Sequence, residues 1–170
     1  MNAPASSRLD LVTTWGVIRL FASAGRLLRC ELPQRVKAPS RAPRIMTRHF
    51  AGAPSDRRVL QRAEKFIRAC LRGQTPPTAP PLAVPAVTAF TARVLAALQK
   101  ISYGATATYG DIARRIGAPR AARAVGMACG ANPLPLFIPC HRVVAAGGAL
   151  GGFSAGLAWK KFLLVKEHAE

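Results

Sequence analysis

The sequence predicts an α/β protein built from two domains, residues 1–85 and residues 86–170. Three observations lead to this prediction. Apolar and polar residues alternate in short runs over residues 9–32, which is typical of antiparallel strands. Residues 73–85 carry five prolines in thirteen positions, which predicts an extended linker. The part after the linker has helical periodicity, and half of the 170 residues are apolar, so each domain can form a modest core.

Three antiparallel strands are expected within residues 9–32. The alternation is interrupted at Trp15 and Gly16 and again at residues 23–26, and tight turns would join the strands at these two places. Residues 33–54 follow as a basic loop rich in proline and arginine, with a short strand near its only isoleucine. We therefore expect a small sheet followed by an irregular segment.

A helix over residues 56–72 completes the first domain. Ser55 stands directly before it and is expected to cap the helix N-terminus, and Gly73 is expected to end the helix. The apolar residues that this spacing places on one face are Leu60, Ala63, Phe66, Ile67, Cys70 and Leu71. The segment therefore has the pattern of an amphipathic helix.

Two short helices in the second domain predict a helix-turn-helix. Thr108 is expected to cap a helix over residues 109–116, with Asp111 three residues later in a position like that of a capping box. Gly117 would end this helix, and a proline suited to a first helical turn opens the next one, at about residues 119–130. Two helices joined by a turn that contains glycine are typical of this motif.

One more helix is expected before this pair, and another after it. The apolar residues that predict the first share one helical face and are Phe90, Val94, Leu95, Leu98 and Ile101. The glycine-rich stretch 147–156 suits a wing or a loop. Residues 158–168 are expected to form a closing helix that carries Glu167.

The charge of the chain indicates an anionic partner. Lysine and arginine number 25 against seven acidic residues, which gives a formal net charge of +18. So large an excess attracts polyanions, with nucleic acid as the leading candidate and an anionic membrane as the alternative. We find no apolar run long enough to span a bilayer, and the N-terminus does not resemble a signal peptide. The sequence thus predicts a soluble cytoplasmic protein.

The cysteines do not predict a metal site. The chain has four, Cys30, Cys70, Cys129 and Cys140, and none lies in a CxxC pair or beside a histidine at metal-ligand spacing. We therefore expect no metal and no cofactor. Reduced thiols are expected in a chain without an export signal.

The segment Ile-Pro-Cys-His-Arg-Val-Val, residues 138–144, is the most informative part of the sequence. It places Cys140 next to His141 in a run that Pro139 is expected to hold extended. A thiol becomes a good nucleophile when an imidazole removes its proton. A buried cysteine that acts only as a small apolar residue is the alternative. The adjacent histidine and the Arg142 charge favour a reactive thiol.

The blocks around this segment resemble a known family. The residues that carry the resemblance run from Ala122 to Ala128, from Asn132 to Val143, from Gly147 to Leu157 and from Lys160 to Glu167. In order and spacing they are similar to the O6-alkylguanine-DNA alkyltransferases, also called methylated-DNA–protein-cysteine methyltransferases. The resemblance is dense from about Val87 onward and faint before it. It implies a ribonuclease H-like N-terminal domain and a winged-helix-like C-terminal domain.

The resemblance also implies an activity and the residues that perform it. Cys140 would accept the alkyl group of O6-alkylguanine, and of O4-alkylthymine, in duplex DNA and keep it as a stable thioether, so each molecule would react once. His141 would act on the thiol through a water, and Glu167 would orient the imidazole. Asn132 would hold the cysteine loop in place by bonding backbone. No zinc-binding set of the kind found in some family members is present, and a monomer is expected.

Further residues are expected to handle DNA. A lesion at guanine O6 is inaccessible in a stacked duplex, so the base must rotate into a pocket. Tyr109 matches the family residue that crowds the 3′ phosphate and faces guanine N3, and Arg123 matches the finger that replaces the flipped base. The neighbours expected to lie against the minor groove are Arg120, Ala122, Ala124 and Gly126.

The substrate pocket is expected to contain Pro135, Cys129, Val143, Gly151, Phe153 and Ser154. The backbone carbonyls of Cys140 and Val143 would accept from guanine N2, and the amide of residue 153 would meet O6. Phe153 departs from the family, which usually has tyrosine there, so any role of a phenol hydroxyl is lost. Two alternatives remain: a non-catalytic sensor of alkylated bases, and a regulator switched by alkylation.

Overall fold

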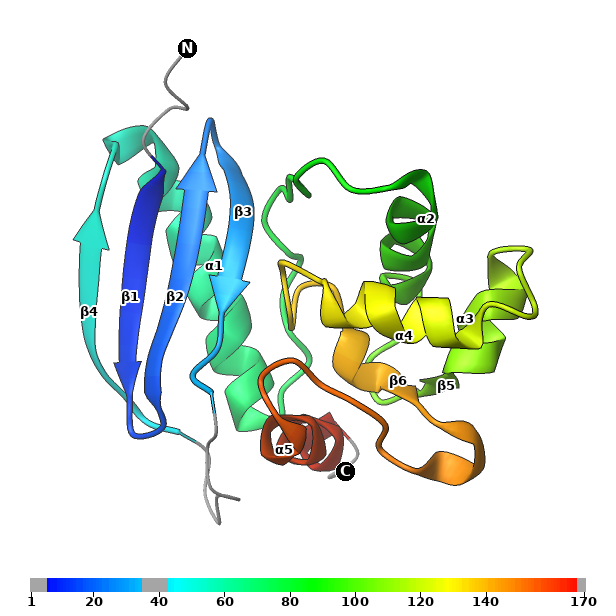
Figure 1. The fold of residues 1–170 in the computed structure, drawn as a ribbon. Coiled ribbons are helices and arrows are strands. Elements are labelled where there is room, and N and C mark those ends of the chain that lie inside the picture. Colours follow the sequence, from blue (N-terminus) through cyan, green and yellow to red (C-terminus); the bar gives the residue numbers. More distant parts are fainter. Residues whose placement is uncertain (1–5, 35–42, 168–170) are drawn as a thin grey trace.

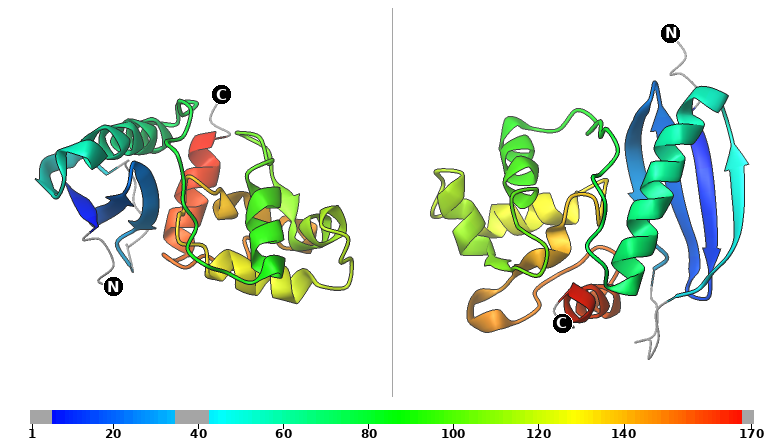
Figure 2. Two further views of the ribbon diagram at one scale, coloured as in Figure 1. Left: turned by 90° about the horizontal axis from the view of Figure 1, so that it is seen from above. Right: turned by 180° about the vertical axis from the view of Figure 1, so that it is seen from behind.

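The computed structural model of the protein describes residues 6–34 and 43–167 and has a mixed α/β fold (Figure 1). Its N-terminal part is an antiparallel sheet of four strands, in the order β3-β2-β1-β4, with one long helix. These elements are β1 (Ser7–Thr13), β2 (Gly16–Ser23), β3 (Arg26–Glu31), β4 (Ile45–Ala51) and α1 (Pro54–Arg72). The helix covers one face of the sheet (Figure 2).

The three strands expected within residues 9–32 are confirmed as β1, β2 and β3. Leu9 pairs with Leu20 and Leu11 with Ile18, and all four side chains are buried. The alternation places these apolar residues on one face of the sheet, where α1 covers them. The fourth strand is longer than the short one predicted near Ile45, because pairing with β1 extends it over seven residues. Residues 35–42 of the predicted basic loop lie outside the described residues.

The predicted helix is confirmed as α1, but its predicted cap is wrong. The N-cap is Ala53, which has no side-chain hydrogen bond, and Ser55 lies exposed within the first turn. Pro54 opens the helix instead, because its fixed φ and missing N–H suit the first turn. Gly73 ends the helix as predicted, with a φ of 71° that favours glycine.

Asp56 anchors the start of α1 to the sheet. Its carboxylate accepts a hydrogen bond from Ser7 Oγ at 2.7 Å and another from the Gly25 amide at 2.9 Å. Ser7 Oγ in turn accepts from the Ala53 amide at 2.9 Å. Asp56 is only 3% exposed, so these bonds satisfy a buried charge while they join the helix, β1 and the β2–β3 turn.

The C-terminal part is mainly helical. Its described elements are α2 (Ala89–Leu98), β5 (Ala107–Thr108), α3 (Tyr109–Arg115), α4 (Ala122–Gly130), β6 (Val143–Val144) and α5 (Leu157–Glu167), with 3-10 turns at Cys140–Arg142 and Ala146–Gly148. The predicted capping box is present, since the Asp111 amide donates to Thr108 Oγ1 and the Thr108 amide to Asp111 Oδ2. The predicted start of the second helix was too early. Pro119 lies in a turn closed by a bond from the Ala121 amide to the Ala118 carbonyl, so α4 begins only after it.

The proline-rich linker runs against the edge of the sheet. The Leu27 amide donates to the Pro81 carbonyl at 2.8 Å, and the Ala83 amide donates to the Leu27 carbonyl at 2.9 Å. These two bonds fix the predicted extended segment along β3.

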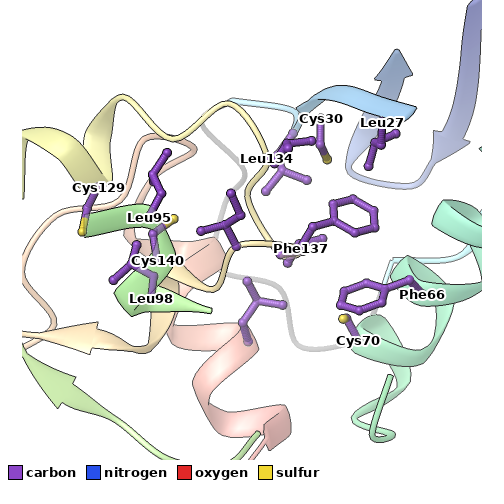
Figure 3. Close-up of a cluster of buried hydrophobic side chains, with 14 of the residues drawn as sticks. Leu27, Cys30, Phe66, Cys70, Leu95, Leu98, Cys129, Leu134, Phe137 and Cys140 are labelled. Atoms are coloured by element: carbon purple, nitrogen blue, oxygen red, sulfur yellow. The ribbon is translucent and has the colours of Figure 1, made fainter. Parts of the chain in front are cut away.

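One hydrophobic cluster runs from the sheet to the segment that leads to Cys140 (Figure 3). The ring of Phe66, on α1, stacks on that of Phe137 with centroids 4.7 Å apart. The Cys30 amide, on β3, donates to the Pro133 carbonyl at 2.9 Å. The N-terminal part therefore supports the cysteine loop directly.

Helix α5 also packs against the N-terminal part. The rings of Trp159 and Trp15 meet edge to face at 4.7 Å, and the indole N–H of Trp159 donates to the Pro33 carbonyl at 3.0 Å. Trp159 is fully buried. The division into two domains at residue 85 stays a prediction, and the packing shows that both parts contribute to one core.

We expect Asp56→Ala to lower the free energy of unfolding by about 2–3 kcal/mol, because it leaves the buried hydroxyl of Ser7 and the partly buried amide of Gly25 without their acceptor. Urea unfolding followed by circular dichroism measures the change. Ser55→Ala in the same helical turn is the control and should change stability by less than about 0.5 kcal/mol. An equal cost for both substitutions would show that Ser55 caps the helix after all.

Candidate active site

Cys140 begins a 3-10 turn, which corrects the prediction that this segment is extended. The Arg142 amide donates to the Pro139 carbonyl at 3.0 Å and closes the turn. Proline cannot continue a helix, but its φ suits the residue before the first helical one. Pro139 therefore directly precedes the turn, and Cys140 and His141 are the first two residues of the turn.

Asn132 holds the cysteine loop. Its side-chain amide donates to the Ile138 carbonyl at 2.8 Å and to Cys140 Sγ at 3.1 Å, and its Oδ1 accepts from the Leu134 amide at 3.0 Å. Between these contacts Leu136 has a φ of 74°, a conformation rare for a branched side chain. Asn132 bonds the chain on both sides of this strained residue, so the loop is fixed around the thiol.

Glu167 receives hydrogen bonds from two basic side chains. Its Oε1 lies 2.8 Å from His141 Nε2, while Arg142 donates through Nε to Oε2 at 2.8 Å and through Nη2 to Oε1 at 3.0 Å. Arg142 also donates to the Ile101 carbonyl at 2.7 Å. The pairing of His141 with Glu167 is as the resemblance implied. The contribution of Arg142 was missed, because in the sequence it was only a nearby charge.

These contacts set the charges of the cluster. Burial alone would raise the pKa of Glu167, but the hydrogen bonds from His141 and Arg142 override it and lower the pKa to about 2. Burial lowers the pKa of His141, although Glu167 opposes this effect. At neutral pH the carboxylate is therefore ionised and the imidazole neutral. With Nε2–H directed at Glu167, Nδ1 carries the lone pair, and it has no hydrogen-bond partner among the described residues.

The Cys140 thiol is protonated at rest. Burial raises its pKa, and the hydrogen bond from Asn132 and the charge of Lys160 offset only part of that rise. A buried thiol of this kind reacts only when a base takes its proton. The neutral imidazole of His141, on the adjacent residue, has a free lone pair on Nδ1 and is chemically able to act as such a base.

Lys160 is a buried residue of the site that the sequence analysis did not single out. Its ammonium donates to the carbonyls of Val143 and Gly152, the latter at 3.1 Å, and lies 5.9 Å from the centre of the Tyr109 ring. Burial lowers the pKa of Lys160, and Cys140 opposes this effect. The available signal was its spacing, since Lys160 precedes Glu167 by seven residues and shares its helix face.

A cavity of about 280 Å³ opens beside the thiol. The residues that line it come from α3, α4, the cysteine turn and the glycine-rich loop: Tyr109, Gly126, Cys129, Gly130, Cys140, Gly152, Phe153 and Ser154. The lining is mostly small or apolar, so the cavity suits a flat, largely apolar group with a few polar edges.

Three of the six predicted pocket residues line this cavity: Cys129, Phe153 and Ser154. Gly151 is not among the lining residues but packs against Tyr109, which is. Val143 is fully buried, and its carbonyl, expected to face substrate, accepts from Lys160. Pro135 lines a neighbouring cavity of about 420 Å³ next to β3, so the structure does not bring it to the same cavity.

Tyr109 stands between two glycines. A Cβ at Gly151, where φ is 64°, would come within 2.8 Å of the Tyr109 hydroxyl, and one at Gly126 would lie 3.7 Å from the ring. The hydroxyl accepts from the Gly152 amide at 3.3 Å. Burial raises the pKa of Tyr109, so the phenol is neutral and its proton is available for donation.

Apart from Tyr109, which begins α3, the residues predicted to meet DNA lie on or just before α4. Arg123 and Arg120 are exposed, and Ala122, Ala124 and Gly126 are partly buried. The structure thus brings Gly126 to the cavity wall and leaves the two arginines at the surface.

The described part of the chain offers neither a metal site nor a membrane-spanning helix. Residues 6–34 and 43–167 include no group of three or more His, Cys, Asp and Glu side chains that could hold a metal ion. Within the same ranges, every helix is too short or too polar to cross a membrane.

Comparison with known sequences relates the C-terminal part to one family. The family model "6-O-methylguanine DNA methyltransferase, DNA binding domain" matches residues 89–169. A methylated-DNA–protein-cysteine methyltransferase of Mycolicibacterium paratuberculosis is 55% identical over 79 residues, which is 46% of this chain and 48% of that protein. One of Methanosarcina acetivorans is 51% identical over 83 residues, 49% of this chain and 53% of that protein. The chain spans about half the length of the curated relatives it matches.

Solved structures extend the similarity to both parts of the chain. The crystal structure of Mycobacterium tuberculosis OGT in complex with DNA matches with a TM-score of 0.76 and 31% identity, over 94% of this chain and 91% of that one. An O6-methylguanine DNA methyltransferase from Methanococcus jannaschii matches with a TM-score of 0.61 and 33% identity, over 91% and 89%. The N-terminal sheet, where the sequence resemblance was faint, is therefore included in the match.

We expect the stabilising effect of Glu167 to be lost in acid. Its folded pKa of about 2 lies below its ordinary value of 4.5, so the stabilisation is complete above pH 4.5 and disappears as the pH falls towards 2. The stability difference between the protein and Glu167→Gln should shrink by about 2 kcal/mol between pH 6 and pH 3. Urea unfolding across this range measures it. A difference independent of pH would mean that Glu167 is not held ionised, and the surface substitution Glu31→Gln controls for general acid effects.

Proposed function

Because the chain belongs to the methylated-DNA–protein-cysteine methyltransferase family, we propose that it repairs DNA by transferring the alkyl group of O6-alkylguanine to its own Cys140. The observation that carries the proposal is the thiol itself. Cys140 Sγ borders the cavity while the adjacent His141 is neutral, buried and bonded to Glu167. In this proposal Cys140 is the nucleophile, His141 is the base and Glu167 is the carboxylate that orients the base.

The reaction that we propose is a displacement at carbon. His141 Nδ1 takes the thiol proton, through a bridging water as the family resemblance implies. The Cys140 sulfur then attacks the alkyl carbon, the S–C bond forms and the C–O6 bond breaks with its electrons left on guanine. The guanine takes up a proton as it leaves. The thioether has no leaving group that water could displace, so each molecule reacts once.

Several groups around the cavity support the departure of guanine in this proposal. Tyr109 borders the cavity with a neutral phenol that can donate towards guanine N3. Ser154 and the Phe153 amide are the candidates to meet O6, and the ring of Phe153 supplies an apolar wall. Lys160 adds a positive charge near the sulfur, which favours the thiolate.

DNA is the proposed partner, bound by the helix-turn-helix of α3 and α4. The high positive charge supplies non-specific attraction to phosphates. We propose that α4 enters the minor groove, with Arg123 in the stack in place of a flipped nucleotide, because a cavity behind the helix is reachable only by an extruded base. In this proposal the protein acts as a monomer, and the part before residue 86 is a ribonuclease H-like domain that supports a winged-helix-like domain.

A sensor of alkylated bases that performs no chemistry is the second candidate. It needs the same pocket and the same DNA surface but no activated nucleophile. The intact Cys140 with its partners Asn132, His141 and Glu167 favours transfer.

Cys140→Ala should abolish alkyl transfer while DNA affinity stays within a few-fold, because the thiol does the chemistry and surface charge does the binding. Intact mass after incubation with a methylated duplex measures the transfer. Cys129→Ala, which changes the other thiol of the cavity, is the control and should retain it. Transfer that persists in Cys140→Ala would contradict the assignment.

Arg123→Ala should slow transfer from duplex DNA at least ten-fold more than transfer from free O6-benzylguanine, since the Arg123 side chain is needed only to fill the place of a base that has flipped out of a duplex. Single-turnover rates on the two substrates give the comparison. Arg8→Ala removes the same charge from the sheet and should affect neither rate by more than about two-fold. Equal losses on both substrates for Arg123→Ala would assign that residue a general charge role.

A further inference from the structure

The solvent side of α1 is a surface of one charge. Between its first and last turns, the exposed residues of this helix are Arg57, Arg58, Gln61, Arg62, Lys65 and Arg72. We call the cations Arg58, Arg62, Lys65 and Arg72 the basic stripe. Their spacing of four, three and seven residues keeps them on one helix face over about 21 Å of axis, at about 1.5 Å per residue.

No acidic side chain of α1 offsets this charge at the surface. Its two acids, Asp56 and Glu64, are 3% and 5% exposed. Asp56 is bonded to Ser7 and Gly25, and Glu64 accepts from Arg68 Nε at 2.8 Å and from Arg48 at 3.4 Å. Surface helices usually place acids and bases four residues apart, which neutralises both. Here the acids point inward, so the stripe keeps its full charge.

A concave site continues the stripe at the C-terminal end of α1. A cavity of about 280 Å³ there is lined by Pro43, Arg44, Ile45, Arg68, Leu71 and Arg72. Three guanidinium groups thus line one hollow, and that of Arg68 is already paired with Glu64, so Arg44 and Arg72 supply the remaining positive charge. Guanidinium groups match phosphate oxygens in geometry and charge.

The stripe faces away from the proposed DNA-binding helix. Viewed from above, α1 runs along one side of the molecule and α4 along the opposite side (Figure 2, left). In Figure 1, α4 lies on the side of the molecule nearest the viewer, and α1 lies behind the sheet. A straight duplex held against α4 cannot also lie along α1.

We propose that the basic stripe binds the phosphate backbone of a second DNA duplex, so that one molecule bridges two segments of DNA. The chemistry of the surface favours a polyanion over a protein, because none of the exposed large apolar side chains belongs to α1 and protein interfaces need an apolar centre. The same lack of apolar anchors disfavours insertion into a membrane. One strand of DNA carries a charge every ~3.4 Å of axis, so the 21 Å stripe faces roughly six phosphates.

The choice of DNA among polyanions rests on the proposed function, whereas the cationic surface does not. The test therefore measures bridging and alkyl transfer separately. A biotinylated duplex on beads is loaded with protein and washed, and a fluorescent second duplex is added at low salt. Retained fluorescence reports bridging, and intact mass on a methylated duplex reports transfer to Cys140.

The informative variant is the triple substitution Arg58→Gln, Arg62→Gln and Lys65→Gln. Its matched control, Arg8→Gln, Arg19→Gln and Arg26→Gln, removes three exposed charges from the sheet. Each lowers the formal net charge of +18 by three. We expect the α1 variant to retain less than a fifth of the bridging, and the control most of it. Binding to a single duplex and transfer should change by less than about two-fold in both.

Several outcomes would overturn the proposal. They are no retention of the second duplex by the unchanged protein, equal loss in both triple variants, and preferential retention of heparin or of vesicles with anionic headgroups over duplex. Sedimentation without DNA measures the oligomeric state of the protein. A dimer would also overturn the proposal, because it could hold two duplexes, each through α4. If the unchanged protein bridges two duplexes but transfers no alkyl group to Cys140, the proposed function is contradicted and the bridging proposal is not.

Discussion

The buried carboxylate of Glu167 is the interaction on which the site depends. A charge removed from water must be paired, and here His141 and Arg142 supply hydrogen bonds to both of its oxygens. This pairing fixes the tautomer of the imidazole and joins the end of α5 to the turn after Cys140. It also requires α5 to dock in one position, which the fully buried Trp159 secures against Trp15 of the N-terminal part.

Burial of Cys140 creates the second constraint. It raises the pKa of the Cys140 thiol, so the thiol stays protonated unless a base takes its proton. The fold opposes that cost with neighbours from three segments: Asn132 in the loop, His141 beside the thiol and Lys160 on α5. The stacking of Phe66 of α1 on Phe137 and the bond from the Cys30 amide of β3 to the Pro133 carbonyl hold the same loop from the other side, so the N-terminal part supports a site to which it contributes no side chain of the cavity.

The surface charge follows from where the acids lie. All six described acidic residues interact with polar or cationic groups of the same molecule: Asp10, Glu31, Asp56, Glu64, Asp111 and Glu167. Most of the basic side chains that the structure describes make no ion pair with an acid, and four of those on α1 form the basic stripe. Part of the positive charge therefore lies on α1, on the side of the molecule opposite α4, which connects the composition with the proposed bridging of two duplexes.

The sequence by itself determined the strands β1 to β3 and the capping box before α3, and it placed Cys140 next to His141, because these features depend on neighbours close in the chain. It also implied Glu167, but only through resemblance. Only the tertiary structure decided the 3-10 turn at Cys140, the partnership of Arg142 with Glu167 and the burial of Lys160. Those features arise from groups tens of residues apart, whose desolvation and hydrogen bonding depend on how α5 packs, and local sequence patterns carry no record of that packing.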